Sequence, residues 1–482
     1  MDRPNVLFVV LDSVSAERLS SYGYERETTP AIDAFADGAV RYTRALANTS
    51  WTVPAHGTFF TGRYPSEHGA NATHKRLDAA PNETLAGRLS AAGYRTVGLS
   101  TNPWVATDFG YDTGFDEFED VRVPLPFEPD GPDAHPRRIL SELGQDRWQG
   151  PRKYPRFAKW ALGGNPVTRV ANTLSFRRDP ASYADADVLN NRLLGWLDDR
   201  DGDAPFFAFC NYMDAHEPYN PDPEWLDRYR DGDCDAKIAW HLRSIDETYD
   251  DSEVACINDR YDACLSYLDD RIGRLLAALD DRGLSEETLV VLTADHGKCL
   301  GEHGYMGVGT YLYDELLRVP LVVSPPAGGP LDALPGDPDS IDGVVTDRTD
   351  QIDIHDAILA AAGVAVERDR PDGVYAETLG PHQDVEVTSR TLPAEGLRRI
   401  DTDDGTLVVD TATGKTVALR AADEGAKKAT GDGDSDRAPA DEASLRERLD
   451  THVDALDFAG ETGAEGGMDA DVQDQLEELG YL

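Results

Sequence analysis

The chain has 482 residues with 90 acidic and 46 basic side chains, which gives a formal net charge of −44. Hydrophobic residues make up 40% of the sequence, a share too large for a disordered acidic chain and sufficient for a folded core. A surface this acidic repels phosphate backbones and anionic headgroups at long range, so we expect no nucleic-acid partner.

Arginine dominates the basic residues, because only 8 of the 46 are lysine. An acid-rich, lysine-poor composition is similar to that of halophilic proteins, and molar salt shortens the screening length between charges to about 3 Å. The chain runs from Met1 into a strand-like segment at 5–11 without a charged and then apolar leader. We therefore expect a cytoplasmic protein in a high-salt cell. The sequence gives no indication of its oligomeric state.

Short β-branched and aromatic runs bounded by turn residues predict strands in the first two thirds of the chain. They lie at residues 6–11, 96–100, 205–212, 288–293 and 319–324. Helical patterns precede two of these runs, at 84–92 and 258–282. Because the runs are almost continuously apolar, both faces of their sheet must be covered. The sequence therefore predicts an α/β fold with a mostly parallel central sheet between helices.

The last third of the chain changes character after Pro330. One helix is predicted at 352–362, and strand signals follow at 397–400, 406–410 and 416–420. We expect a main domain over residues 1–382, with an insertion at about 122–182, and a smaller C-terminal α+β unit over 383–482. The Gly-, Asp- and Ala-rich residues 422–443 predict an acidic linker.

The cysteines form no CxxC pair and no regular framework. This spacing favours small buried residues over a disulfide scaffold or a zinc ribbon. The five are Cys210, Cys234, Cys256, Cys264 and Cys299.

Acidic side chains directly follow two of the predicted strands. Asp12 ends the first predicted strand within the segment VLFVVLDS, and Asp295 and His296 follow the strand at 288–293. Ligands of open α/β sheets bind beyond the carboxyl ends of the strands, where these groups would meet. Two carboxylates and an imidazole suit one divalent metal ion, Mn, Zn, Ca or Mg, and the histidine favours a transition metal. Taken singly, either motif could equally have a structural role.

A hydroxyl residue, Thr52, leads into a predicted helix within SWTVPAHGTFFTGR, residues 50–63. A hydroxyl at a helix N-terminus faces the positive end of the helix dipole and free N–H groups, which favour an alkoxide and bind anionic esters. Contact with a metal would favour the alkoxide further. The alternative is that Thr52 only caps the helix.

Together these residues resemble the sulfatase family of the alkaline phosphatase superfamily. The resemblance spans nearly the whole chain and rests on six ordered motifs: PNVLFVVLDS, TVPAHGTFFTGRYPSEHG, NYMDAHEPY, TADHGKCLGEHG, LLRVPLVV and LEELGYL. It implies an alkaline-phosphatase-like sheet, a catalytic domain over 1–382 and a metal-dependent hydrolase that acts on an anionic ester.

The resemblance also implies roles for single residues. Thr52 falls where sulfatases have the cysteine or serine that is oxidised to formylglycine, and it would also contact the metal. Asp12, Asp295 and His296 fall on metal-ligand positions. His216 falls on the substrate-contacting histidine of the HxPY motif and could assist the leaving group in catalysis; the alternative is an ordinary loop histidine.

Two further side chains are candidates for contact with the substrate. Lys298 follows the metal-site histidine by two residues and could bind an anion or assist catalysis; the alternative is a solvated lysine. His56 stands where the family has an arginine, four residues after the nucleophile; the alternative is a packing residue of the helix.

The sequence departs from the family pattern in ways that remove charge from the site. Besides His56 in place of arginine, Ser13 replaces a second aspartate, and Val308 stands where a loop lysine is expected. Above all, Thr52 cannot become formylglycine, because that aldehyde forms from a primary carbon and the hydroxyl carbon of threonine is secondary.

A threonine nucleophile favours phosphorus over sulfur as the reacting atom. A formylglycine hydrate expels sulfate by collapsing to the aldehyde, whereas an ester on Thr52 must be released by water, a step that suits phosphoryl groups better. Threonine is also the nucleophile of relatives such as nucleotide pyrophosphatases and phosphoglycerol transferases. We therefore expect a phosphodiester or phosphonate ester as substrate. The alternatives are a sulfuric ester hydrolase, a phosphoglycerol-type transferase and an inactive polyanion-binding protein.

The family resemblance does not explain residues 137–178, which carry ten basic and two acidic side chains interleaved with five aromatic ones. In one interpretation these cations pair with acidic groups elsewhere in the protein. In the other, the segment is an arm near the active site that attracts an anionic substrate, a sulfated or phosphorylated glycan, or an anionic membrane surface.

Overall fold

The computed structural model describes residues 3–122, 127, 153–178, 185–200, 202–232, 234, 249–326, 343–366, 371–380, 395–421 and 441–459. Nearly all of the predicted linker at 422–443, the motif LEELGYL and residues 137–152 lie outside these ranges. The chain divides into two compact units. One comprises Met1–Asp120 and Ala186–Thr462, and the other Val121–Asp185 and Gly463–Leu482.

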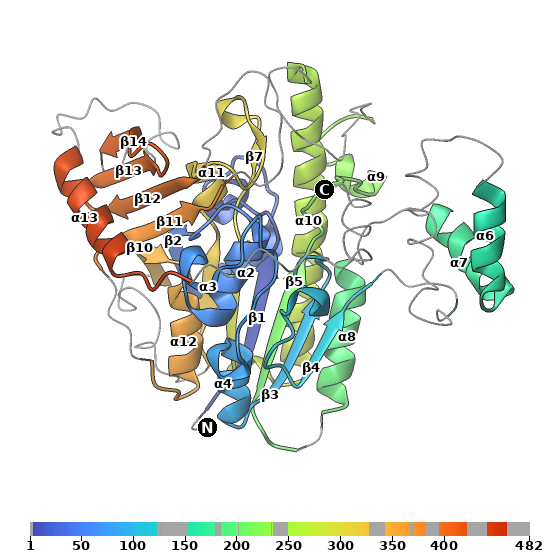
Figure 1. Ribbon diagram of the computed structural model, residues 1–482. Helices are drawn as coiled ribbons and strands as arrows, with labels where there is room; N and C mark the ends of the chain where they lie inside the picture. The colour runs from blue at the N-terminus through green and yellow to red at the C-terminus, as the bar shows by residue number, and fades with distance from the viewer. Residues whose placement is uncertain are drawn as a thin grey trace. The chain divides into compact units, whose positions relative to one another are not determined.

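An eight-stranded sheet forms the centre of the first unit (Figure 1). In spatial order its strands are β10 (Val344–Asp350), β2 (Val40–Leu46), β9 (Leu321–Ser324), β6 (Thr288–Ala294), β1 (Asn5–Leu11), β5 (Phe206–Tyr212), β3 (Arg95–Ser100) and β4 (Glu117–Asp120). All neighbours are parallel except the two pairs that involve β9. The predicted mostly parallel α/β sheet is therefore confirmed.

Helices cover both faces of this sheet, as the complete burial of β1, β5 and β6 requires. One set comprises α1 (Pro30–Ala36), α8 (Ala186–Asp198) and α10 (Asp251–Asp281), and the other α2 (Thr52–Thr61), α4 (Leu85–Ala91) and α12 (Asp353–Ala361). The shorter elements are α3 (Pro65–His68), α9 (Pro223–Leu226), α11 (Asp314–Leu317), β7 (Cys299–Leu300) and β8 (Met306–Gly307).

A smaller antiparallel sheet follows in the chain. It consists of β11 (Val374–Thr378), β12 (Leu397–Thr402), β13 (Gly405–Asp410) and β14 (Thr416–Ala421), in that order. Helix α13 (Glu442–Asp454) packs on it through Leu445 and Leu449 (Figure 1). This is the predicted α+β unit, although β11 shows that its sheet begins before residue 383.

The second unit contains a pair of helices, α6 (Lys153–Leu162) and α7 (Pro166–Arg178). Arg169 of α7 lies with its guanidinium carbon 5.2 Å from the ring centre of Trp160 and donates a hydrogen bond of 2.7 Å to the Trp160 carbonyl. Within the described ranges of the whole chain, no helix is both long and apolar enough to cross a membrane.

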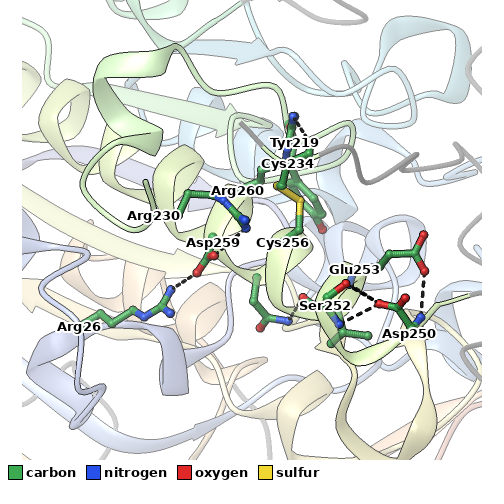
Figure 2. The surroundings of a disulfide bond; sticks show 12 residues. Arg26, Tyr219, Arg230, Cys234, Asp250, Ser252, Glu253, Cys256, Asp259 and Arg260 are labelled. Atoms are coloured by element: carbon green, nitrogen blue, oxygen red, sulfur yellow. Dashed lines mark hydrogen bonds and ion pairs between the residues drawn. A yellow bond between two sulfur atoms is a disulfide. The ribbon is translucent and has the colours of Figure 1, made fainter. Parts of the chain in front are cut away.

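The expectation for the cysteines was wrong for two of the five. Cys234 and Cys256 form a disulfide that joins the segment after β5 to α10 (Figure 2). The other three, Cys210, Cys264 and Cys299, are free and buried as expected. Sequence spacing did not reveal the bond, because its partners are 22 residues apart and meet only when the segment after β5 folds onto α10.

Candidate functional site

The site lies where neighbouring parallel strands end. Strand β1 lies between β5 and β6, with Leu11 opposite both Tyr212 and Ala294. The next residues, Asp12 and Asp295, therefore lie side by side at the carboxyl edge of the sheet. Strands β5 and β3, which follow β1 in the sheet, bring further polar residues to this edge. The chain reaches His216 after β5 and Asn102 after β3.

The three predicted metal ligands meet at this edge. The ligand atoms of Asp12, Asp295 and His296 all lie within 4.8 Å of one another, and the three residues are buried. Asp295 accepts hydrogen bonds at Oδ1 from the N–H groups of Ser13, at 3.0 Å, and His296, at 2.8 Å. Its Oδ2 accepts none from the described part of the chain, which leaves one buried oxygen available to a cation.

The two carboxylates repel each other in a buried setting. Burial and the charge of Asp12 raise the pKa of Asp295 well above its ordinary value. Burial also opposes ionisation of Asp12, but the imidazoles of His216, His296 and His56 give this carboxyl a net lowered pKa. A divalent cation would remove the repulsion, and two carboxylates with one imidazole are a suitable donor set for it. The residues present therefore fit the metal that the family implies.

Thr52 lies beside this cluster as the first residue of α2. Its Oγ1 is 3.2 Å from Nε2 of His296. The other ring nitrogen of His296 is 2.7 Å from the Gly297 carbonyl, which can only accept, so Nδ1 carries the proton and Nε2 presents a lone pair. Trp51 is the N-cap residue, with extended backbone, so Thr52 is not the cap that the sequence left as an alternative.

His56 lies one turn further along α2 and holds the backbone of Thr52. Its Nδ1–H donates to the Thr52 carbonyl at 3.0 Å, and its Nε2 accepts from the Asn211 amide at 3.2 Å. The ring is fully buried among the rings of Phe59, Phe60, Tyr111 and Phe209. Burial lowers its pKa to about 4, so His56 is neutral. This environment corresponds to the packing alternative, since both ring nitrogens are engaged by the protein.

His216 and Lys298 form a second group, together with Glu217. The Lys298 ammonium pairs with the Glu217 carboxylate, and Lys298 is only 2% exposed, which excludes the solvated alternative for this lysine. Nδ1–H of His216 donates to the Glu217 carbonyl at 2.8 Å. Burial lowers the pKa of Lys298 to about 7, while burial and the charge of Lys298 lower that of His216 to about 3.

Sequence reasoning missed the contacts that Asn102, Ser13 and Glu217 make in this site. Asn102 donates to Oδ2 of Asp12 at 2.6 Å, and the Ser13 hydroxyl donates to Oδ1 of the same carboxylate at 2.8 Å. Ser13 has a φ of 59°, a left-handed conformation that is costly for a residue other than glycine and is found mostly at functional sites. Asn102 could have been recognised as a candidate site residue, because it lies just after a predicted strand. No feature of the sequence pattern indicated Glu217.

Comparison with known proteins agrees with this arrangement. A model of the sulfatase family matches residues 4–364. The chain is 26% identical over 346 residues to the uncharacterized sulfatase YidJ of Escherichia coli, covering 68% of this chain and 64% of YidJ. It is 29% identical over 361 residues to steryl-sulfatase of Mus musculus, covering 63% of this chain and 53% of the relative. The chain thus spans less than two thirds of either protein.

A solved structure supports the fold independently. The phosphonate monoester hydrolase of Agrobacterium radiobacter superposes with a TM-score of 0.56 at 21% identity, covering 84% of this chain and 87% of that one. Because the family model spans the strand-end carboxylates, the segment that carries Thr52 and the HxPY motif, the conclusion is direct: this chain belongs to the sulfatase family of the alkaline phosphatase superfamily.

Proposed function

We propose that this chain hydrolyses phosphonate monoesters or phosphodiesters through a covalent ester on Thr52. The observation that carries the proposal is the 3.2 Å approach of Thr52 Oγ1 to the unprotonated Nε2 of His296, beside two buried carboxylates. A secondary alcohol cannot form the aldehyde on which sulfatases depend. The similarity in fold to an enzyme named as a phosphonate monoester hydrolase supports the same substrate class.

In the first step, the Thr52 hydroxyl loses its proton to solvent, and Oγ1 bonds to phosphorus as the bond to the leaving group breaks. A divalent cation held by Asp12, Asp295 and His296 would supply positive charge at the reacting oxygens. The first turn of α2 adds backbone N–H groups and the positive end of the helix dipole. The hydrogen bond from His56 Nδ1–H to the Thr52 carbonyl fixes the backbone of Thr52 and so keeps its hydroxyl in position.

The leaving group would receive its proton from the second group of the site, which consists of His216, Glu217 and Lys298. Lys298, with a pKa of about 7, can donate near neutral pH, and its contact with Glu217 holds the ammonium in place. His216 lies next to this pair, and because its Nδ1–H donates to the Glu217 carbonyl, its unprotonated Nε2 would accept a hydrogen bond from a hydroxyl of the substrate or from the attacking water. Water then attacks phosphorus and the bond from phosphorus to Thr52 Oγ1 breaks. Oγ1 takes up a proton to restore the hydroxyl, and Lys298, which lost its proton in the first step, is protonated again from solvent.

The test is a panel of nitrophenyl esters that share one leaving group and differ in the transferred group. Purified protein in molar salt with a divalent metal would receive the phenylphosphonate monoester, the phosphodiester, the phosphate monoester and the sulfate. We expect the phosphonate or the diester to turn over fastest. A sulfate ester cleaved faster by orders of magnitude would refute the substrate class.

Substitution of the nucleophile tests the mechanism in the same assay. Thr52→Ala should lose at least about a thousandfold in kcat, because no other hydroxyl replaces the nucleophile. Thr52→Ser is the matched control, since it keeps the hydroxyl and should keep most of the activity. An active Thr52→Ala variant with a native fold would refute the covalent mechanism.

A further inference from the structure

The helix pair of the second unit exposes large apolar side chains. Leu162 is 74% exposed, Val167 is 72% exposed and Leu174 is 64% exposed. Leu162 and Val167 lie on the two sides of the turn that joins α6 to α7. Val167 and Leu174 are seven residues apart on α7, so they lie on the same face of that helix. We call these three side chains the apolar tip of the hairpin.

The charge of the hairpin is opposite to that of the rest of the protein. From Lys153 to Arg178, the span of α6 and α7, the sequence has six basic residues and no acidic residue, in a chain with a net charge of −44. Among the described side chains, Lys159 is exposed on α6. Trp160, which Arg169 covers, and Phe157 are partly exposed beside it. The hairpin therefore combines cations, aromatic rings and exposed aliphatic groups.

We propose that the hairpin of α6 and α7 binds the surface of an anionic lipid membrane. The apolar tip would enter the boundary between headgroups and acyl chains, while the basic residues contact the phosphates of the headgroups. This occupant accounts for the cations and for the exposed aliphatic side chains together. A sulfated glycan would need the cations but would gain nothing from Leu162, Val167 and Leu174. Pairing with the protein's own acidic surface would likewise leave them in water.

High salt should weaken the electrostatic contribution to membrane binding and leave the contribution from apolar burial in place. At about 1 M salt the screening length is about 3 Å, so attraction to the headgroups acts only near contact. The burial of apolar side chains is not weakened in this way. Binding should therefore weaken from low to molar salt but persist, which distinguishes the hairpin from a purely electrostatic patch.

Flotation of the full-length protein with vesicles tests the proposal. The vesicles would contain phosphatidylcholine alone or phosphatidylcholine with phosphatidylglycerol, in low and in molar salt. One variant combines Leu162→Ser, Val167→Ser and Leu174→Ser, and a second combines Lys153→Glu, Arg156→Glu and Lys159→Glu. We expect wild type to bind the anionic vesicles. Each variant should bind them at least roughly tenfold more weakly than wild type.

Matched changes in the first unit serve as controls. Val417 and Leu419 on β14 are 57% and 38% exposed, so their replacement by serine removes apolar surface from the first unit and leaves α6 and α7 unchanged. Arg192→Glu with Arg274→Glu reverses two exposed cations. Both control proteins should float like wild type, and circular dichroism would verify the fold of every variant.

The outcomes decide the proposal without reference to catalysis. Equal binding of the hairpin variants and wild type would overturn it, as would the absence of wild-type binding to anionic vesicles. Retention on a soluble sulfated glycan that the serine variant leaves unchanged, without vesicle binding, would identify a glycan site instead. Nitrophenyl ester turnover in solution should be the same for both hairpin variants and wild type, whatever the substrate class.

Discussion

The buried carboxylates explain why this site would hold a single cation. Asp12 already receives hydrogen bonds from Asn102 and Ser13 at both oxygens, whereas Oδ2 of Asp295 receives none among the described residues. Serine at position 13 leaves two carboxylates, Asp12 and Asp295, in the candidate metal site. The hydroxyl of Ser13 instead orients Asp12.

We predict one tightly bound divalent ion per chain and a strong dependence of its affinity on Asp295. Asp295→Asn should weaken binding by about 100-fold or more, since it removes a charged ligand. Elemental analysis after dialysis gives the stoichiometry, and calorimetric titration gives the affinity. Asp269→Asn is the control, because Asp269 is also buried but accepts hydrogen bonds from Ala31 and Ile32 on α1. Two tightly bound ions, or activity that a chelator does not affect, would contradict the prediction.

His56 makes the stability of the protein dependent on pH. Its pKa is about 4 in the folded state because it is buried, against an ordinary value of 6.5. Below pH 6.5 the unfolded chain therefore takes up a proton that the folded chain does not. Stability contributed by neutral His56 is present above pH 6.5 and is lost as the pH falls towards 4. From pH 7 to pH 5 this loss amounts to about 2 kcal/mol.

Urea unfolding of wild type and His56→Asn at pH 7 and pH 5 measures this effect. Asparagine keeps a donor for the Thr52 carbonyl and does not titrate, so the variant should lose less stability between the two pH values. The difference isolates His56 from other buried histidines, such as His216, which contribute to both proteins. Equal losses in the two proteins would show that His56 does not remain neutral in the fold.

At the scale of elements, the disulfide fastens a segment that carries site residues. The segment after β5 contains His216 and Tyr219, and Cys234 joins it to α10 at Cys256 (Figure 2). Arg260, one turn further along α10, donates to the carbonyls of Tyr219 and Cys234 at 3.1 and 3.2 Å. The loop that carries the HxPY motif is thus attached to the longest helix at several points.

We predict that removal of this disulfide destabilises the protein by about 3 kcal/mol, the value for closure of a loop of this length in the unfolded chain. Denaturant unfolding of the Cys234→Ala, Cys256→Ala double variant measures the loss. Reductant should destabilise wild type and leave the double variant unchanged. Cys264→Ala removes a free buried thiol of α10 and serves as the control. A double variant as stable as the control would refute the prediction.

The elements differ in how well their sequence predicts them. Strands β1, β5 and β6 were predictable because every residue in them is buried and nearly all are apolar. Strands β4 and β10, at the edges of the sheet, were not, because they carry exposed charged residues. The same limit applies to the site. Asp12 and Asp295 follow apolar strands directly, whereas Glu217 and the disulfide depend on how loops fold onto α10 and the strand ends.

At the scale of the whole molecule, the excess of acidic residues dominates. With 90 acidic and 46 basic side chains, at most about half of the carboxylates can pair one to one with a cation. The remainder repel one another, and this repulsion destabilises the folded chain more than the expanded unfolded one. Described ion pairs such as Arg399 with Asp401 and Asp314 are local exceptions.

We predict that thermal stability rises with salt, because the screening length falls from about 10 Å at 0.1 M to about 3 Å at 1 M. The midpoint of unfolding, followed by circular dichroism at constant pH and metal concentration, should increase by several degrees in potassium chloride. Chloride is preferable to sulfate, since sulfate also strengthens apolar burial by exclusion from the surface. Sucrose at matched osmolarity controls for exclusion, and it should produce a smaller increase. A midpoint that does not change between these salt concentrations would mean that charge repulsion is not a major term and that the composition does not reflect adaptation to high salt.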